Sequence, residues 1–114
     1  MPEKVLPEIK VTLTRCQPGE KAVPLEYPRN LGLRTKLGGD PEWIQGENTP
    51  DCPSCKKPMT FVAQIDSAEH WSKTNPLSRE PGREQQDYMF GDVGMIYVFF
   101  CFECLETKSV FDCY

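Results

Sequence analysis

The fold of this chain depends on two stretches, Cys52-Pro53-Ser54-Cys55 and Cys101-Phe102-Glu103-Cys104. Each is a C-x-x-C sequence, in which two sulfurs on one tight turn can bind the same metal ion. Together they supply the four soft ligands that a closed tetrahedral zinc site requires, namely Cys52, Cys55, Cys101 and Cys104. We therefore predict one structural Zn²⁺, although iron would also suit four thiolates.

Two other interpretations of these cysteines stay open. In a thioredoxin-like redox motif, one C-x-x-C opens a helix within a βαβ unit, and no helical pattern follows either pair here. Two disulfides are the other possibility, but disulfides persist in oxidising compartments. No apolar signal sequence follows Met1, so we expect a cytoplasmic protein, in which metal-bound or free thiols are more common.

Two cysteines and the single histidine lie outside this set. We expect Cys16 and Cys113 each to be a small buried residue, since free cysteine is among the most buried residue types. A disulfide between them, or one of them in place of a presumed ligand, is the alternative. His70 lies in a polar segment, where we expect it to be solvated.

The length and composition indicate one small, mostly β domain over residues 1–114. The chain has 11 prolines and 8 glycines, which leave few stretches long enough for a helix. We predict a small antiparallel sheet with a zinc-ribbon-like four-cysteine site, and an α+β fold at most. The domain would comprise an N-terminal strand and loop over 1–36 and a metal-bearing lobe over 37–114.

The N-terminal part carries one clear strand pattern. Polar and apolar residues alternate over Glu8–Thr14, which is typical of a half-exposed strand. A short edge strand is expected over Val23–Tyr27. After the turn at Gly38 and Gly39, we expect Trp43 to bury its ring against the metal-bearing lobe.

The metal-bearing lobe begins with a strand predicted over Met59–Asp66, where apolar and polar residues alternate again. A short helical turn is expected from Asp66 towards Trp71. Residues 72–86 are polar and contain Pro76, Pro81 and Gly82, which favours a mobile loop.

The last third of the chain is the most apolar. Gly94–Phe102 is apolar on both faces, which predicts a strand buried in the middle of its sheet. This strand would deliver Cys101 and Cys104 at its end. A turn over Leu105–Lys108 and a final strand over Ser109–Tyr114 complete the prediction.

The charge of the chain argues against two classes of partner. Lys and Arg number 13 against 17 Asp and Glu, giving a net charge of −4 and no basic stripe. We therefore expect no nucleic-acid binding and no attachment to anionic membranes. The longest apolar run, Met95–Phe102, is far too short to span a bilayer.

The sequence offers no recognisable catalytic group of residues. A closed four-thiolate site has no open position at which to activate water. No nucleophile can be assigned to His70, and Gly38-Gly39 lacks the lysine of a phosphate-binding loop. We expect a non-enzymatic, zinc-stabilised module that binds another protein, with no binding residue or partner identified. A metal-dependent or thiol-redox enzyme is the alternative, and it would need a reactive cysteine free of metal.

The order of motifs from Leu37 to Tyr114 adds a family resemblance. The motifs are Leu37–Gln45, Cys52–Cys55, Met59–Asp66, Phe90–Gly94, Ile96–Phe99 and the terminal Cys113-Tyr114. This order resembles the bacterial YwqG-like proteins, a family of unknown function. More distantly, it is similar to the C-terminal domain of programmed cell death protein 2, from a eukaryotic family implicated as chaperones of a ribosomal protein. Some YwqG-like proteins occur near toxin systems, so the resemblance also implies a bacterial toxin-immunity role as an alternative function.

Overall fold

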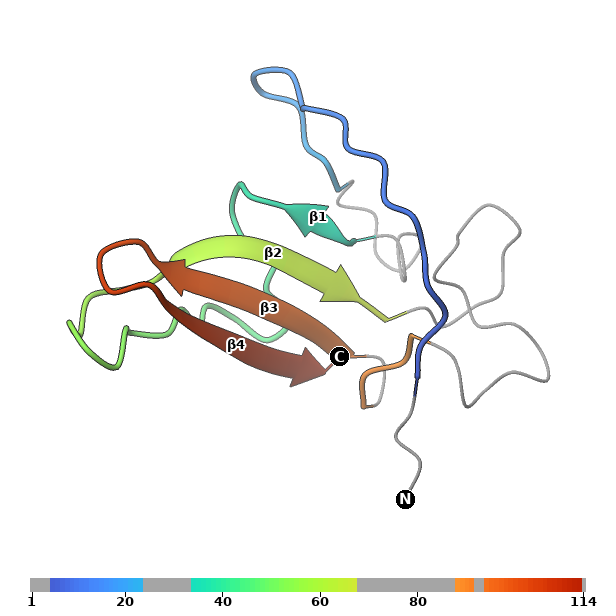
Figure 1. Ribbon diagram of the computed structural model, residues 1–114. Helices are drawn as coiled ribbons and strands as arrows, with labels where there is room; N and C mark the ends of the chain where they lie inside the picture. The colour runs from blue at the N-terminus through green and yellow to red at the C-terminus, as the bar shows by residue number, and fades with distance from the viewer. Residues whose placement is uncertain (1–4, 24–33, 68–87, 92–93, 114) are drawn as a thin grey trace.

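The computed structural model describes residues 5–23, 34–67, 88–91 and 94–113. It contains one antiparallel sheet in the order β1-β2-β3-β4, and no helix occurs among the described residues (Figure 1). The strands are β1 (Lys36–Leu37), β2 (Thr60–Asp66), β3 (Gly94–Cys101) and β4 (Glu106–Cys113). The predicted mostly β fold with a small antiparallel sheet is confirmed.

Strand β3 lies inside the sheet, between β2 and β4. It pairs with β4 without interruption from Gly94↔Cys113 to Cys101↔Glu106. Its pairing with β2 shifts register between Phe61 and Ala63, which marks a bulge in β2. Central placement of the most apolar stretch confirms the prediction from its composition.

Only one face of β3 is fully buried, so the expectation of burial on both faces is wrong. Met95, Tyr97, Phe99 and Cys101 are all buried on one face. On the other face the alternate residues, Ile96, Val98 and Phe100, are half-buried. Phe102 lies beyond the strand and is 68% exposed, because the turn that carries it leaves the sheet. An apolar composition on both faces therefore overstates how much of the sheet is covered.

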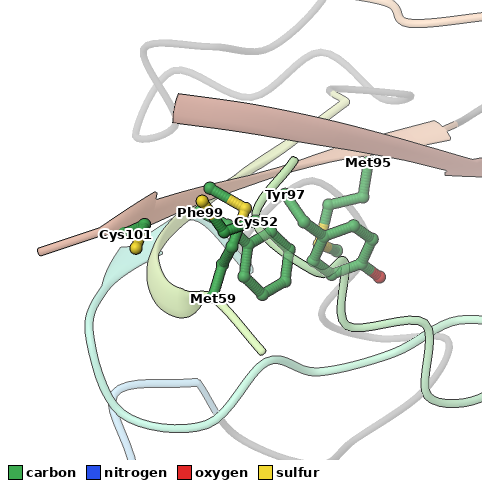
Figure 2. Close-up of a cluster of buried hydrophobic side chains, with 6 residues drawn as sticks. All are labelled: Cys52, Met59, Met95, Tyr97, Phe99 and Cys101. Atoms are coloured by element: carbon green, nitrogen blue, oxygen red, sulfur yellow. The ribbon is translucent and has the colours of Figure 1, made fainter. Parts of the chain in front are cut away.

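The hydrophobic core joins the buried face of β3 to the cysteine stretches. Besides the four buried residues of β3, it contains Cys52 and Met59 (Figure 2). The Trp43 ring lies 4.6 Å from that of Tyr97 and is stacked 5.9 Å from that of Phe99, centroid to centroid. Trp43 thus covers the core beside the cysteines, as the sequence predicted.

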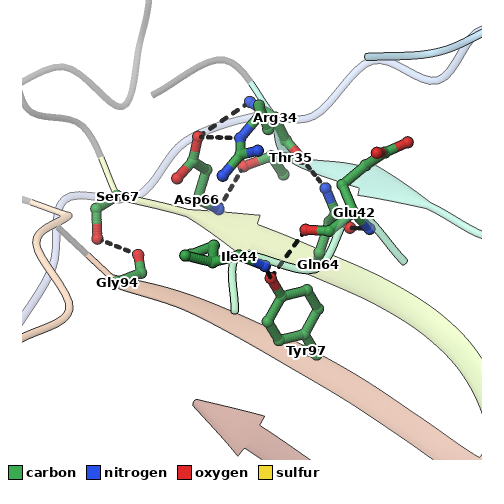
Figure 3. Close-up of polar contacts among 9 residues, drawn as sticks. All are labelled: Arg34, Thr35, Glu42, Ile44, Gln64, Asp66, Ser67, Gly94 and Tyr97. Carbon is green, nitrogen blue, oxygen red and sulfur yellow. Dashed lines mark hydrogen bonds and ion pairs between the residues drawn. The ribbon is translucent and has the colours of Figure 1, made fainter. Parts of the chain in front are cut away.

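Two buried polar side chains hold the segment around Trp43 against the sheet (Figure 3). Gln64 donates to the Arg34 carbonyl at 2.6 Å and accepts from the Glu42 amide at 2.9 Å. The Tyr97 hydroxyl donates to the Glu42 carbonyl at 2.9 Å and accepts from the Ile44 amide at 3.2 Å. Because both side chains are fully buried, these bonds satisfy groups that would otherwise be costly to bury.

A second polar group closes the C-terminal end of β2. The buried carboxylate of Asp66 accepts from the Arg34 amide and lies 3.8 Å from the Arg34 guanidinium. The Asp66 amide donates to the Thr35 hydroxyl at 2.9 Å. The next residue, Ser67, donates its hydroxyl proton to the Gly94 carbonyl at the start of β3. These bonds connect β1, β2 and β3 at one end of the sheet (Figure 3).

The prediction of a strand over Glu8–Thr14 is wrong. That segment pairs with no described strand, and Val11 and Leu13 are 73% and 71% exposed. Alternation marks a possible strand, but a strand also needs a partner edge to take its backbone hydrogen bonds. The edge strand of the sheet is instead Lys36–Leu37, which pairs with β2. A turn of two glycines with positive φ, Gly38 and Gly39, follows it directly.

The final strand begins earlier than predicted. It starts at Glu106 and not at Ser109, so the predicted turn over Leu105–Lys108 is wrong. The turn is made by residues 102–105, within and just after the cysteine pair.

Several other predictions lie largely or wholly outside the described residues: the edge strand after Val23, the helical turn towards Trp71, His70 and the loop 72–86. The division of the domain at residue 37 stays a prediction.

Candidate metal centre

Two similar turns present the cysteines: a first knuckle, residues 52–57, and a second knuckle, residues 101–105. In each, the residue after the second cysteine donates its amide proton to the carbonyl of the first. These bonds are Lys56 N–H to Cys52 at 2.9 Å and Leu105 N–H to Cys101 at 2.8 Å. Lys56 and Leu105 both have left-handed backbone, with φ of 66° and 59°. The two knuckles therefore share this hydrogen bond and a left-handed residue after the second cysteine.

The first knuckle is also closed as a small hairpin. The Cys52 amide donates to the Lys57 carbonyl at 2.9 Å, and the Met59 amide donates to the Pro50 carbonyl at 3.0 Å. The second knuckle is the turn between β3 and β4, so the sheet itself positions it. Both knuckles are thus held by backbone bonds that do not involve the sulfurs.

The structure brings the four predicted cysteines together. Their sulfurs all lie within 4.8 Å of one another, and Cys55 Sγ lies 3.8 Å from Cys101 Sγ. Tetrahedral zinc with bonds of about 2.3 Å sets its ligand sulfurs about 3.8 Å apart, whereas a disulfide needs about 2.0 Å. All six cysteines are free. The arrangement fits a metal cage and not a pair of disulfides.

The two remaining cysteines do not join this cluster. Cys16 is exposed, so the expectation that it is buried is wrong. It lies in the N-terminal segment 5–23, in which Val23 is the only described residue that is fully buried. Cys113 is half-buried at the end of β4.

The electrostatics of the cage favour a bound cation. Backbone N–H groups of Cys55 and Ser54 point to the Cys52 sulfur and lower the pKa of that thiol to about 7. Burial and the neighbouring thiols instead raise the pKa of Cys104 to about 12. One thiolate therefore forms readily, but four cannot form together without a positive charge between them. A divalent metal ion would supply that charge and displace the thiol protons.

Two side-chain contacts join the first knuckle to the second knuckle and to the start of β4. The Ser54 hydroxyl donates to Glu106 at 3.0 Å, and Lys57 Nζ lies 3.2 Å from a Glu103 carboxylate oxygen. The side chains of Lys57 and Glu103 are about two-thirds exposed, so water and salt screen their attraction. No sequence pattern indicated these pairs, because they depend on how the two knuckles face each other.

The second knuckle presents apolar side chains to solvent. Phe102 and Leu105 are 68% and 74% exposed. The Phe102 ring meets Phe100 edge to face at 4.8 Å. These two rings, together with Pro58 and Thr60, line a small open hollow of about 190 Å³ beside the cage. Sequence reasoning did not foresee this surface. Its exposure could have been predicted from the position of Phe102 between the two cysteines, because the inner residues of a C-x-x-C lie on a turn.

Comparisons with known proteins give one match and no activity. No family model matches the chain, and no solved structure matches it significantly. The chain is 31% identical over 104 residues to the uncharacterized protein YpfL of Salmonella typhimurium. The match takes 89% of this chain and 20% of YpfL, so the chain spans about a fifth of that relative's length. Within the described residues, no helix is long and apolar enough to cross a membrane.

Proposed function

We propose that the chain is a zinc-stabilised module that binds another protein through its second knuckle. Four sulfurs within 4.8 Å of one another support a single metal ion with thiolate ligands only. Zinc suits four thiolates in a tetrahedron, and such a site has no open position for substrate or water. The proposed role of the metal is therefore structural, and the proposed activity is binding and not catalysis.

The observation that carries the binding proposal is the exposure of Phe102 and Leu105 on a turn that a backbone hydrogen bond closes. A non-glycine residue in left-handed backbone costs about 1–2 kcal/mol, so glycine would suit position 105 better for stability alone. Leucine there places an apolar side chain 74% in solvent. Rigid, exposed apolar residues are typical anchors in protein interfaces, because little conformational entropy is lost when they are covered.

The surroundings of these side chains indicate the chemistry of the partner. The hollow beside Phe102 has an apolar wall from Phe100 and Pro58, and a lysine and a glutamate, Lys57 and Glu103, at its margin. That margin carries both signs of charge, so it favours neither an acidic nor a basic ligand. The proposed partner presents an aliphatic or aromatic side chain to the hollow, surrounded by polar groups.

The match to YpfL supports the interpretation of the chain as a module. The similar region occupies only about a fifth of that protein, so a related sequence occurs as one part of a longer chain. An enzymatic or toxin-immunity role has no comparable observation in its favour.

Site-specific photo-crosslinking in cells tests the binding proposal. A photoreactive phenylalanine replaces Phe102, and a control places it at Leu13, which is equally exposed but far in sequence from the four cysteines of the cage. We expect a defined adduct at position 102 that excess wild-type protein prevents. A metal-loaded Phe102→Ser/Leu105→Ser variant should not prevent it. The same adduct from position 13, or equal competition by the double variant, would contradict the proposal.

A further inference from the structure

The two edges of the sheet differ in length and regularity. Strand β1, at one edge, has 2 residues, a length too short to recruit another strand. Strand β4, at the other edge, has 8 residues and pairs with β3 without a bulge. It contains no proline and only one lysine, Lys108, so it lacks most of the devices that block edge pairing. No described strand pairs with its outer side (Figure 1).

The backbone groups on the outer side of β4 can be assigned. The Cys113 carbonyl accepts from the Gln45 side chain at 2.5 Å, so it points away from β3. Because backbone groups alternate direction along an antiparallel strand, Thr107, Ser109 and Phe111 also direct their N–H and C=O groups outward. Gln45 already bonds the last part of this edge, because its amide donates to the Asp112 carboxylate at 3.2 Å and its side chain donates to the Cys113 carbonyl. The outward groups of Thr107, Ser109 and Phe111 form the row that another strand can bond.

We propose that a second copy of this chain pairs with β4, antiparallel and two-fold symmetric about Val110. In this register Ser109 bonds Phe111 of the second copy, and Phe111 bonds Ser109. Lys108 then faces Asp112 of the second copy, and the symmetry repeats this contact, giving two attractive pairs. Lys108, Val110 and Asp112 lie on one face of β4, so each charge meets its partner on the same face.

Charge favours this register over two others that the backbone allows. Moving the two-fold axis to Ser109 places Glu106 opposite Asp112, which is a repulsive pair. Moving it to Lys108 places the two lysines opposite each other. Opposite charges directly across a strand pair stabilise it, and like charges destabilise it. Of these three registers, only the one centred on Val110 has attractive pairs.

The resulting dimer would be weak and reversible. Pairing along one strand edge buries less surface than a stable interface of about 1,200–2,000 Å². Association would therefore depend on protein concentration. The proposal is independent of partner binding at the second knuckle, because it uses the backbone edge of β4 and not Phe102 or Leu105.

Sedimentation velocity of the metal-loaded chain under reducing conditions tests this proposal. We expect wild-type protein to pass from monomer to dimer as its concentration rises. Lys108→Glu and Asp112→Lys, each measured alone, should weaken dimerisation roughly tenfold or more, because each makes both pairs repulsive. An equimolar mixture of the two variants should dimerise again. In that heterodimer both carboxylates of the Lys108→Glu chain face lysines of the Asp112→Lys chain, so both pairs are attractive.

Ser109→Pro provides a second, charge-independent variant. It removes an outward N–H at the centre of the edge and leaves the bonds between β3 and β4 in place, so it should be a metal-loaded monomer. A wild-type chain that stays monomeric up to its solubility limit would overturn the proposal. So would a dimer that survives Ser109→Pro, or charge variants whose mixture does not associate.

Discussion

At the scale of one residue, Leu105 combines an unfavourable backbone conformation with an exposed apolar side chain. Its φ of 59° is left-handed, and its side chain is 74% exposed. Leu105→Gly removes a backbone strain energy of about 1–2 kcal/mol. Glycine also loses more conformational entropy on folding than leucine does, which offsets part of this gain. We predict that the variant is more stable by about 0.5–1 kcal/mol, measured as the urea unfolding midpoint of metal-loaded protein.

Thr107→Gly is the matched control for Leu105→Gly. Thr107 lies two residues further along, in the regular part of β4, and pairs with Phe100. Glycine weakens a strand interior, so this variant should lose roughly 0.5–1 kcal/mol. If Leu105→Gly destabilises the protein as much as Thr107→Gly does, the left-handed cost assigned to Leu105 is wrong.

Tyr97 gives the fold a defined sensitivity to alkaline pH. Burial raises the pKa of its hydroxyl from 10 to about 12. The unfolded chain therefore releases this proton at lower pH than the folded chain. The stabilisation is complete below pH 10 and is lost as the pH rises towards 12. We predict that the unfolding free energy of wild-type protein falls over this range.

Tyr97→Phe isolates the contribution of that hydroxyl. The variant loses the bonds to Glu42 and Ile44, so it should be less stable at neutral pH. Its unfolding free energy should fall less steeply than that of wild type above pH 10, since the other titrating groups are unchanged. Parallel slopes for the two proteins would show that Tyr97 is not responsible.

At the scale of elements, Gln64 connects three parts of the fold. It bonds the Arg34 carbonyl before β1 and the Glu42 amide beside Trp43, from a fully buried position in β2. Gln64→Leu keeps the volume but leaves both backbone groups without this partner. We predict a loss of about 2–4 kcal/mol in unfolding free energy, measured by chemical denaturation.

Gln45→Leu is the control for Gln64→Leu. Gln45 also donates to a backbone carbonyl, that of Cys113, but in an exposed position where water can replace the bond. The same substitution there should cost roughly 0.5 kcal/mol or less. Equal losses of unfolding free energy at the two positions would mean that burial does not determine how much the Gln64 hydrogen bonds contribute to stability.

Local pattern predicted the two strands of the metal-bearing lobe that precede the second knuckle, but it could not show which segments find a pairing partner. The alternation over Met59–Asp66 and the apolar run from Gly94 both became strands. Glu8–Thr14 alternates as well and did not, because no described edge accepts it. The start of β4 was missed because a C-x-x-C turn ends one residue after its second cysteine, which places Glu106 back in the sheet.

For the molecule as a whole, the cage joins two distant parts of the chain. The first knuckle precedes β2, and the second connects β3 to β4, so a metal ion would fix both to one point of the core. Apparent binding energies for structural zinc are about 10–16 kcal/mol, comparable with the total stability of a small domain, about 5–15 kcal/mol. We predict that a strong chelator abolishes the near-UV circular dichroism of the Trp43, Tyr97 and Phe99 cluster.

The candidate metal site was the part of the molecule most open to prediction. Spacing alone identified the four cysteines, because a C-x-x-C turn directs two sulfurs to one point whatever surrounds it. The contacts Ser54–Glu106 and Lys57–Glu103 could not be predicted, since they depend on the relative orientation of two turns far apart in sequence.

Native mass spectrometry, on protein purified without added metal, tests the central claim most directly. Wild type is compared with Cys52→Ser, which removes a buried ligand, and with Cys16→Ser, which removes an exposed cysteine outside the cage. The account predicts one zinc ion per chain in wild type and in Cys16→Ser, and none in Cys52→Ser. A metal-free wild-type chain with its thiols protonated would contradict it, as would a mass lowered by the protons lost to disulfides.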